Sequence, residues 1–580
     1  MGGTPFEGVN YSSIAFADID GDNDQDVLIT GQNASSQLIS KLYRNNSPQV
    51  SAITYTYNNG WLPSDPSGVS TALDDIVVAS GDATISSPTS VNSVIVNPGA
   101  GLTVNTGVTL TATVGLEFES SATNYSSLIL DGTVAGTMTY ERHVNINGSG
   151  STGSNDLVSA PLTGQDFASF ATANPNILNN GALYLFGPFE KVTGQYVNWA
   201  ATETATLEEG VGYRTGTSDN GTVTFTGTAQ NGLVTNDIQN AGTNNAEWNL
   251  VGNPYPSYMN VQQFLNHDVG GVSNIQLFDT GTAAIYGYDG NALNGWTIYN
   301  SANTTASTLI APGQGFFVGA DFTNASSYDL EFTPAMRSTG SGDDFISGRN
   351  AELIYLKLKA STTTNSFGTD FYFNTNSSLG FDVGYDANIW GDTTPDFAIY
   401  SHLVQDNVGD AITLQSLDMS NLSDVTIPLG VNANQGEQLT FSIVDKTLPD
   451  AVNVYLDDVV ANTSTLLNTG DYVITPTANL SGTGRFFLRT SQDVLLTIDN
   501  NQNILNIFAL YSSKELVISG QLNDATTLEL YDLQGRQVLS TTLDITTLEN
   551  RINVSNLSGG VYVATIQNNT QQKSQKVIIK

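Results

Sequence analysis

An acidic loop near the N-terminus carries the residues that are best arranged for chemistry. Five aspartates alternate with other residues in the stretch FADIDGDNDQDVLITG, residues 16–31: Asp18, Asp20, Asp22, Asp24 and Asp26. Alternate carboxylates in a tight loop can converge on one hard cation, and Ca²⁺ prefers about six to eight oxygen ligands. Gly21 allows the sharp turn, and the carbonyl of Asp24 can supply a further ligand. The spacing therefore predicts a calcium site within residues 18–26.

The loop differs from an EF-hand and has one competing interpretation. Ile29 stands where an EF-hand needs its bidentate glutamate, and the following segment DVLITG is typical of a strand instead of a helix. The alternative to a metal site is a solvated acidic turn. We favour calcium, because carboxylates this close together repel one another strongly unless a cation neutralises them.

The loop and its flanks resemble a known repeat. The segment YSSIAFADIDGDNDQDVLITG, followed by KLYRN, is similar to an FG-GAP or VCBS-type repeat, the blade unit of calcium-binding β-propellers. One blade cannot close a propeller, which needs at least about four blades. Either further blades precede this segment, or it packs alone. Since MGGTPFEGVNYSS lacks the features of a signal peptide, we expect the chain to be the C-terminal part of a longer exported protein, with a genuine short form as the alternative.

The charge of the chain excludes several classes of partner. Only 18 Lys and Arg residues stand against 55 Asp and Glu, which gives a formal net charge of -37. This charge repels the phosphates of DNA and RNA and acidic membrane surfaces, so we expect no nucleic-acid partner. Cysteine is absent, which rules out disulfides, thiolate metal sites and a cysteine nucleophile. No apolar stretch reaches the roughly 18 residues that a transmembrane segment takes.

Catalysis has little support in the sequence. The three histidines, His143, His267 and His402, are scattered over different parts of the chain. The motifs G-x-S-x-G and H-E-x-x-H and a phosphate-binding glycine loop are missing. A carboxylate pair for glycoside hydrolysis stays open, because the separation of two acidic side chains is a property of the fold. We predict that the chain is not an enzyme.

Residue types and their alternation predict an all-β fold. Short runs rich in Val, Ile, Thr, Tyr and Phe alternate with clusters of Gly, Asn, Asp and Ser, and only TGQDFASFATAN and MNVQQFLNH suggest short helices. At roughly 150 residues per domain, 580 residues make about four domains. Changes of pattern divide the chain into a calcium-binding propeller-type repeat (1–50), a β-solenoid-like spacer (51–140), two copies of a β unit (141–240 and 241–345), a β-sandwich (346–497) and a small antiparallel sandwich (498–580).

The predicted spacer has two possible structures. Residues 51–140 carry short β runs that return about every ten residues, punctuated by Gly and Asn. The spacing suits either coils of a β-solenoid, whose neighbouring rungs pair, or ordinary hairpins. We favour the solenoid, and neither form carries chemistry by itself.

An internal duplication spans the middle of the chain. The segments NDLVSAPLTGQDF and LEEGVGYRTG match WNLVGNPYPSYMNVQQF and IAPGQGFFVG in the same order. The match places Trp199 opposite Trp296 and Tyr213 opposite Phe316. Such aromatic side chains can stack on sugar rings or pack in a core. We favour the core, because a duplicated fold must keep its core side chains.

The C-terminal residues 501–580 differ in composition and carry their own motifs. Acidic and basic residues are equal in number here, whereas the rest of the chain is strongly acidic. The segments LELYDLQGRQVLS and INVSNLSGGVYVATIQNNTQQKSQKVIIK predict a hairpin turn at Gly535 and Arg536, a glycine turn before Tyr562 and a basic final strand. The motifs LYDLQGR, LSGGVY and KVIIK resemble the type A C-terminal sorting domain of type IX secretion.

That resemblance implies a route out of the cell. It implies passage through the periplasm, recognition of this domain by the type IX machinery at the outer membrane, and cleavage with attachment of the protein to the cell surface. The residues on the family's pattern are Tyr531, Gly535, Arg536, Gly560, Tyr562 and Lys576. Turn glycines, core tyrosines and solvated cations are their ordinary structural roles. Segments such as WNLVGNPYP are loosely similar to large secreted proteins of Bacteroidetes.

These patterns predict an exported, multi-domain all-β protein at the cell surface or outside the cell. We expect Ca²⁺ as its cofactor, and adhesion or the binding of a glycan or protein ligand as its role. The alternative is a non-catalytic C-terminal carrier region of a larger secreted enzyme.

Overall fold

About half of the described residues lie in β-strands. The computed structural model describes residues 6–19, 25–45, 52–145, 155–288, 296–321, 328–343, 353–391, 393–492, 505–511 and 513–580. Strands hold 51% of the described residues and helices 5%, so the predicted all-β class is confirmed. Among the helices of these ranges, none has the length and apolar character of a membrane span.

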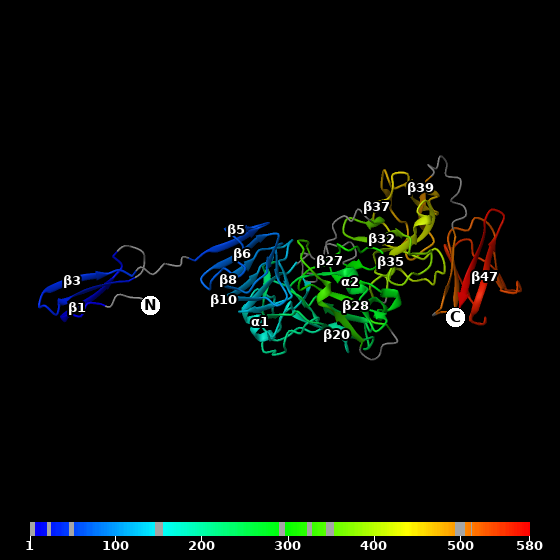
Figure 1. Cartoon of the computed structure of the whole chain (residues 1–580). Coiled ribbons are helices and arrows are strands. Elements are labelled where there is room, and N and C mark those ends of the chain that lie inside the picture. Colours follow the sequence, from blue (N-terminus) through cyan, green and yellow to red (C-terminus); the bar gives the residue numbers. More distant parts are fainter. Residues whose placement is uncertain are drawn as a thin grey trace.

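A three-stranded antiparallel sheet, which we call the N-terminal sheet, stands apart at one end of the molecule (Figure 1). Its strands are β1 (Asn10–Ala17), β2 (Asp26–Gln32) and β3 (Leu38–Tyr43), in that order. Strand β2 follows the acidic loop directly, as predicted. Among the described residues of this sheet, Ile29 is the one buried hydrophobic side chain, whereas Phe16 and Leu38 are mostly exposed. The sheet therefore has almost no core of its own.

The next module pairs its strands in parallel. The larger ladder contains β4 (Thr54–Asn58), β6 (Asp75–Ser80), β8 (Thr89–Val96) and β10 (Thr109–Phe118), and β10 also pairs with β12 (Thr133–Ala135) and β13 (Met138–His143). The smaller ladder contains β7 (Asp82–Ile85), β9 (Gly101–Val104) and β11 (Ser127–Leu130). Parallel pairing of strands from successive coils defines a solenoid, so this prediction is confirmed. Strand β5 (Trp61–Leu62) covers the open edge of β4.

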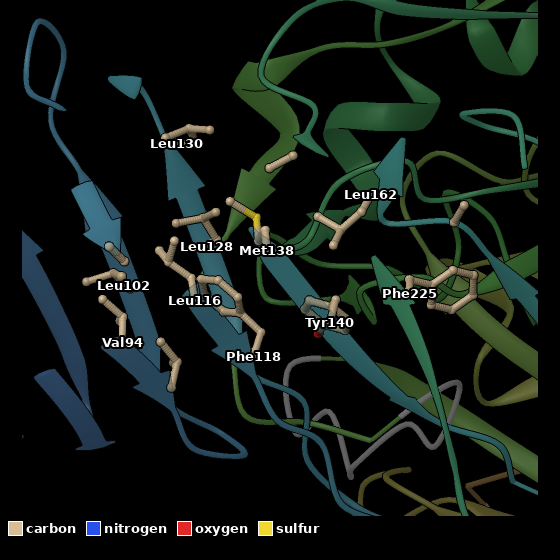
Figure 2. Close-up of a cluster of buried hydrophobic side chains, with 14 of the residues drawn as sticks. Val94, Leu102, Leu116, Phe118, Leu128, Leu130, Met138, Tyr140, Leu162 and Phe225 are labelled. Carbon is tan, nitrogen blue, oxygen red and sulfur yellow. The ribbon is translucent and has the colours of Figure 1, made fainter. Parts of the chain in front are cut away.

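Figure 2 shows the buried core of the solenoid running into the next module. Because the ladders are in register, like positions stack: Val94 lies opposite Leu116, and Leu102 lies opposite Leu128. Each fully buried aliphatic side chain of this kind contributes about 1.5–3 kcal/mol. At the far end of the larger ladder, β19 (Thr222–Ala229) pairs antiparallel with β13 and adds Phe225 to the same core.

Two sheets of the middle region share one topology. Their strand orders are β14-β18-β16-β17 and β21-β28-β25-β26, so that the first strand of each copy pairs with the last. The bounds are β14 (Asp156–Ser159), β16 (Phe186–Glu190), β17 (Gln195–Tyr196), β18 (Gly212–Thr215), β21 (Trp248–Gly252), β25 (Ile285–Tyr288), β26 (Trp296–Tyr299) and β28 (Gly315–Gly319). The two predicted helices, α1 (Phe167–Ala173) and α2 (Val261–Leu265), occupy the same place after the first strand of each copy.

Short elements complete the two copies. Each helix begins with a side-chain cap, in which Asp166 accepts from the Ser169 N–H and Asn260 accepts from the Gln263 N–H. The remaining strands are β15 (Leu162–Thr163), β20 (Val234–Ile238), β22 (Tyr258–Asn260), β23 (Asp268–Val269), β24 (Val272–Ser273), β27 (Leu309–Ile310), β29 (Tyr328–Phe332) and β30 (Arg337–Ser338).

The strand register corrects one aromatic pairing that the duplicated sequence suggested. Arg214, next to Tyr213, pairs with Gly187, and Phe317, next to Phe316, pairs with Tyr286, so Phe189 corresponds to Tyr288. Tyr196 lies opposite Phe189, and Trp296 lies opposite Tyr288. Trp296 therefore corresponds to Tyr196, and Trp199 corresponds to Tyr299 further along the strand. The expected equivalence of Trp199 and Trp296 is wrong, because the connection between the two strands is longer in the second copy. The other expected pair is buried in both copies: Tyr213 and Phe316.

The domain before the C-terminal module, residues 353–491, is one continuous sheet, and we call it the last β domain. Its order is β39-β38-β41-β36-β34-β35-β32-β31-β37-β40, with β33 beside β35. The bounds are β31 (Ile354–Ser361), β32 (Ser366–Asn374), β33 (Ala387–Asn388), β34 (Ala398–Ser401), β35 (Ile412–Asp418), β36 (Asp424–Asn432), β37 (Leu439–Lys446), β38 (Asn453–Asp458), β39 (Thr463–Leu466), β40 (Tyr472–Ile474) and β41 (Phe486–Ser491). The ring of Phe441 in β37 lies 5.0 Å from that of Phe486 in β41, so distant strands of the sheet face each other across one core, as in a sandwich.

The C-terminal module, residues 505–580, consists of two antiparallel sheets around a separate core. One sheet has the order β42-β43-β46, and the other has the order β45-β44-β47-β48. The bounds are β42 (Asn506–Leu510), β43 (Glu515–Ser519), β44 (Thr527–Asp532), β45 (Gln537–Thr542), β46 (Glu549–Asn553), β47 (Gly560–Gln567) and β48 (Gln572–Ile579). Side chains of both sheets, including Ile518 and Leu530, are buried between them.

Candidate functional site

Two of the five aspartates of the acidic loop lie in the described residues. Asp18 is exposed at the end of β1, and Asp26 is buried at the start of β2. The Asp26 carboxylate accepts hydrogen bonds from the N–H of Ile19 (3.1 Å) and from the N–H of Asn45 (2.8 Å), so it joins the loop to the chain after β3.

The other three aspartates are Asp20, Asp22 and Asp24, which lie outside the described residues. Within the described ranges, no three His, Asp or Glu side chains gather as a metal site would require. The calcium site stays a prediction, because its central ligands fall in the part that is not described.

A tight turn between β44 and β45 carries two residues of the sorting pattern. The Asp532 carboxylate accepts from the N–H of Gln534 and of Arg536, both at 2.9 Å, and from Nε of Arg536 at 2.8 Å. These bonds hold the pKa of Asp532 below its usual range, and the bond from the Arg536 N–H has the largest effect. Gly535 has a φ of +77°, a left-handed conformation that favours glycine. The sequence D-x-x-G-R therefore builds the turn from its own side chains.

The turn presents its side chains to solvent. The Arg536 side chain is 77% exposed even though it pairs with Asp532. Leu533, an apolar residue in the same turn, is 70% exposed. The turn therefore leaves both an apolar and a cationic side chain open to solvent.

Strand register places the sorting-pattern residues on the two faces of one sheet. Tyr531 of β44 lies opposite Val563 of β47, which lies opposite Lys576 of β48, so Tyr531 and Lys576 share the outer face. The Tyr531 hydroxyl donates to Glu529 at 2.7 Å. Tyr562 points to the opposite, core face.

Of the two sorting-pattern residues at the start of β47, Tyr562 has a structural role and Gly560 has none that requires glycine. The Tyr562 side chain is buried, and its hydroxyl donates to the carbonyl of Ser558 at 2.7 Å, which fixes the LSGG turn. A Cβ built on Gly560 would lie 3.8 Å from the Tyr562 ring, an ordinary contact. The backbone at Gly560 therefore does not demand glycine.

Lys576 contacts the preceding domain. Its Nζ atom lies 2.9 Å from Oδ1 of Asp406, and the two side chains are 55% and 45% exposed. Sequence reasoning missed both Asp406 and Asp532 as partners of the sorting-pattern residues. Asp532 had a recognisable signal, an aspartate that opens a turn ending in glycine. Asp406 had none, because it comes from another domain.

The three histidines lie apart in the structure. His143 and His402 are buried in different modules, and Nε2 of His267 lies 2.9 Å from Glu331 in the second copy of the duplicated unit. These placements bring no two histidines together.

Aromatic side chains gather where the duplicated units meet the last β domain. Trp296 of β26 stacks on Trp390, with ring centroids 4.9 Å apart and an interplanar angle of 23°. Tyr288 lies edge-on to Trp296 at 5.7 Å, and Tyr196 of the first copy packs nearby against Phe317 at 6.1 Å. All of these rings except Phe317 are partly exposed. We call Tyr196, Tyr288, Trp296 and Trp390 the junction rings.

Comparison with known protein families assigns the two main parts of the chain. Residues 512–580 match the family model described as a secretion system C-terminal sorting domain. The protein is therefore a substrate of type IX secretion, which is handled by that machinery and delivered to the cell surface or the extracellular space.

The larger part of the chain has a family of its own. Residues 51–489, well over half of the 580 residues, match the family model "Domain of unknown function (DUF8693)". The chain belongs to this family. No match was found among the curated proteins.

Proposed function

We propose that this protein is a non-catalytic binding protein of the cell surface, which serves in adhesion or in glycan binding. The observation that carries the proposal is the combination of a C-terminal sorting domain with a long series of β modules. Figure 1 supports it, because the N-terminal sheet and the C-terminal module lie at opposite ends of the molecule. A protein that is held at its C-terminus would present the other modules outward.

The junction rings are the favoured glycan contact. Flat aromatic faces suit the apolar faces of sugar rings, and Tyr and Trp also bring a polar group. Trp390 has a buried indole N–H with no hydrogen-bond acceptor among the described residues. That N–H is closed to a surface ligand, so the sugar contact would rest on the partly exposed, stacked rings of Trp296 and Trp390.

Calcium at the acidic loop is the proposed cofactor. Its ligands would be Asp18, Asp20, Asp22, Asp24 and Asp26. The Asp26 carboxylate already accepts two backbone hydrogen bonds, which hold it at the mouth of the loop. A cation there would neutralise the crowded carboxylates and fix the connection between β1 and β2. Its role would be structural, as in other oxygen-ligand calcium sites.

A glycan array on the full chain tests the binding role. We expect binding to at least one class of glycan, and we expect Trp296→Ala to abolish it. Tyr213→Phe is the control, because Tyr213 is an aromatic residue of the first copy that is buried and is not one of the junction rings. Absence of binding with calcium and with a chelator would contradict the proposal.

A carrier role is the second candidate. The exposed apolar face of the N-terminal sheet favours it, because this sheet needs another structure against it. In that case these modules would be the non-catalytic C-terminal carrier region of a larger secreted enzyme, and the array would stay empty. Enzyme activity of the secreted full-length protein would then replace glycan binding as the positive result.

A further inference from the structure

One sheet of the C-terminal module buries apolar side chains on both faces. In β42, Ile507 and Ala509 point into the core of the module, and Phe508 between them points the other way. Phe508 is nevertheless only 4% exposed. Its cross-strand partner Val517 in β43 is completely buried and is also outside the module's core cluster. Something other than the module's own second sheet covers this outer face.

The cover is the last β domain. The ring of His402 meets the ring of Phe508 edge-on, with centroids 5.3 Å apart. At Gly409 the two parts approach so closely that a Cβ would lie 3.1 Å from the Phe508 ring and 2.4 Å from Cδ2 of Leu510. The loop 402–410 therefore forms a seat into which the aromatic side chain of β42 fits.

Polar contacts surround this apolar centre. The Thr483 hydroxyl lies 3.4 Å from the hydroxyl of Ser519, and the ion pair of Lys576 with Asp406 closes another side. At Gly484 a Cβ would lie 2.9 Å from the backbone nitrogen of Gly520, so the two backbones nearly touch. An apolar centre with a polar rim is the usual anatomy of a specific protein interface.

The strand that makes this contact is not part of the sorting family match. The DUF8693 match ends at residue 489, and the sorting-domain match begins at 512. Strand β42 (Asn506–Leu510) lies between them and pairs with β43 along its whole length. Strand β42 is therefore part of the C-terminal module although it lies outside both matches, and it carries the side chain that docks.

We propose that the last β domain is a docking platform that fixes the orientation of the C-terminal module for export. The platform holds Phe508 and the sorting-pattern residue Lys576, and it leaves the turn with Leu533 and Arg536 free for the secretion machinery. This inference rests on the sorting role of the module. Recognition through Lys576 then requires that its ion pair with Asp406 opens, whereas recognition through the turn does not.

Hydrogen–deuterium exchange of the full chain with Phe508→Ala tests the docking. We expect the amides of residues 402–410 to exchange about tenfold faster or more, because their cover is lost, and the strands β44 and β47 to change less than about twofold. Leu533→Ala is the matched control, since it truncates an apolar side chain of the same module that is already 70% exposed. Unchanged exchange at residues 402–410 would overturn the platform.

A charge exchange covers the case in which Phe508→Ala unfolds the module. Asp406→Lys and Lys576→Asp each place like charges together at an exposed position, and the double variant restores an ion pair. We expect each single variant to speed exchange at residues 402–410 by about threefold, in keeping with a partly exposed pair, and the double variant to return it to normal. Failure of the double variant to rescue would contradict the proposed contact.

Surface display separates docking from sorting. Deletion of residues 512–580 should abolish display if the module is the sorting signal, whatever the platform does. Phe508→Ala should reduce display several-fold while the protein stays folded. Loss of docking with normal display would overturn the role of the platform in export and leave the sorting function intact. Normal display of the deletion variant would overturn the sorting function itself.

Discussion

The two ends of the molecule use the same kind of β-strand with different results. The N-terminal sheet and the C-terminal module are both small and antiparallel, and both carry apolar residues on two faces of a sheet. In the C-terminal module these faces are covered, one by a second sheet and the other by the last β domain. In the N-terminal sheet Ile14 and Phe16 are 56% and 62% exposed.

The difference shows what a local pattern cannot supply. Strand register puts Ile14 opposite Ile29 on one face of the N-terminal sheet and Leu28 opposite Leu42 on the other. Three strands cannot cover either face, and a unit of this size rarely folds alone without metal, disulfide or partner. The C-terminal module solves the same problem with four further strands. Coverage by other elements, more than strand pattern, decides which end is stable.

Core truncation should separate the two ends most clearly. Leu530→Ala removes a side chain that is completely buried in the C-terminal module, and we expect a loss of about 3 kcal/mol in the stability of that module. Phe16→Ala in the N-terminal sheet should cost less than about 0.5 kcal/mol, because the ring is largely exposed. Denaturant titration followed by amide exchange of each region measures both. Equal losses would mean that the N-terminal sheet has a cover of its own.

Calcium should act on the N-terminal end alone. If the acidic loop binds Ca²⁺, a concentration of about one hundred times Kd stabilises that sheet by about 2.7 kcal/mol. Asp18→Ala combined with Asp22→Ala should abolish the effect, and Asp268→Ala, an exposed aspartate elsewhere, should not. Amide exchange of β1 and β2 with calcium and with a chelator gives the stability, and calorimetric titration gives the binding. A titration unchanged in the double variant would refute the site.

Acid should loosen the C-terminal docking before it unfolds the module. Burial lowers the pKa of His402 from its ordinary value of 6.5 to about 4. The docked state therefore favours the neutral ring of His402. The contribution of this neutral ring to the free energy of docking is fully present above pH 6.5 and is lost as the pH falls from 6.5 through about 4. At pH 4.5 we expect docking to weaken by about 2 kcal/mol, seen as faster exchange at residues 402–410. His402→Gln should remove most of this pH dependence; the same dependence in that variant would assign it to other groups.

The smallest expected difference lies between two glycines of the sorting pattern. Gly535→Ala places a Cβ at a φ of +77°, where nothing lies within 4 Å, so its cost is backbone strain of about 1 kcal/mol. Gly560→Ala meets only an ordinary contact with Tyr562, and we expect no measurable loss. Thermal melts of the C-terminal module in the full chain compare the two. Equal stability of both variants would contradict the strained turn.

Local patterns predicted most of the elements and part of the site. The turn at Gly535 and Arg536, the two short helices and the parallel coils all follow from residue types at fixed spacing. The equivalence of Trp199 and Trp296 failed, because a longer connection shifts the register and no local signal marks it. The partners of Lys576 and Phe508 were also out of reach, since they come from a loop about one hundred or more residues away in the chain.

By itself, the sequence determined that this protein is a series of β modules with a sorting domain at its C-terminus. Alternation of residue types fixes strands, and turn chemistry fixes the hairpin at Gly535, because both act between near neighbours in the chain. The tertiary structure alone decided which apolar faces are covered and which sorting-pattern residue contacts the last β domain. Those contacts depend on side chains that meet only after the modules have folded and packed, such as Phe508 with His402 and Lys576 with Asp406.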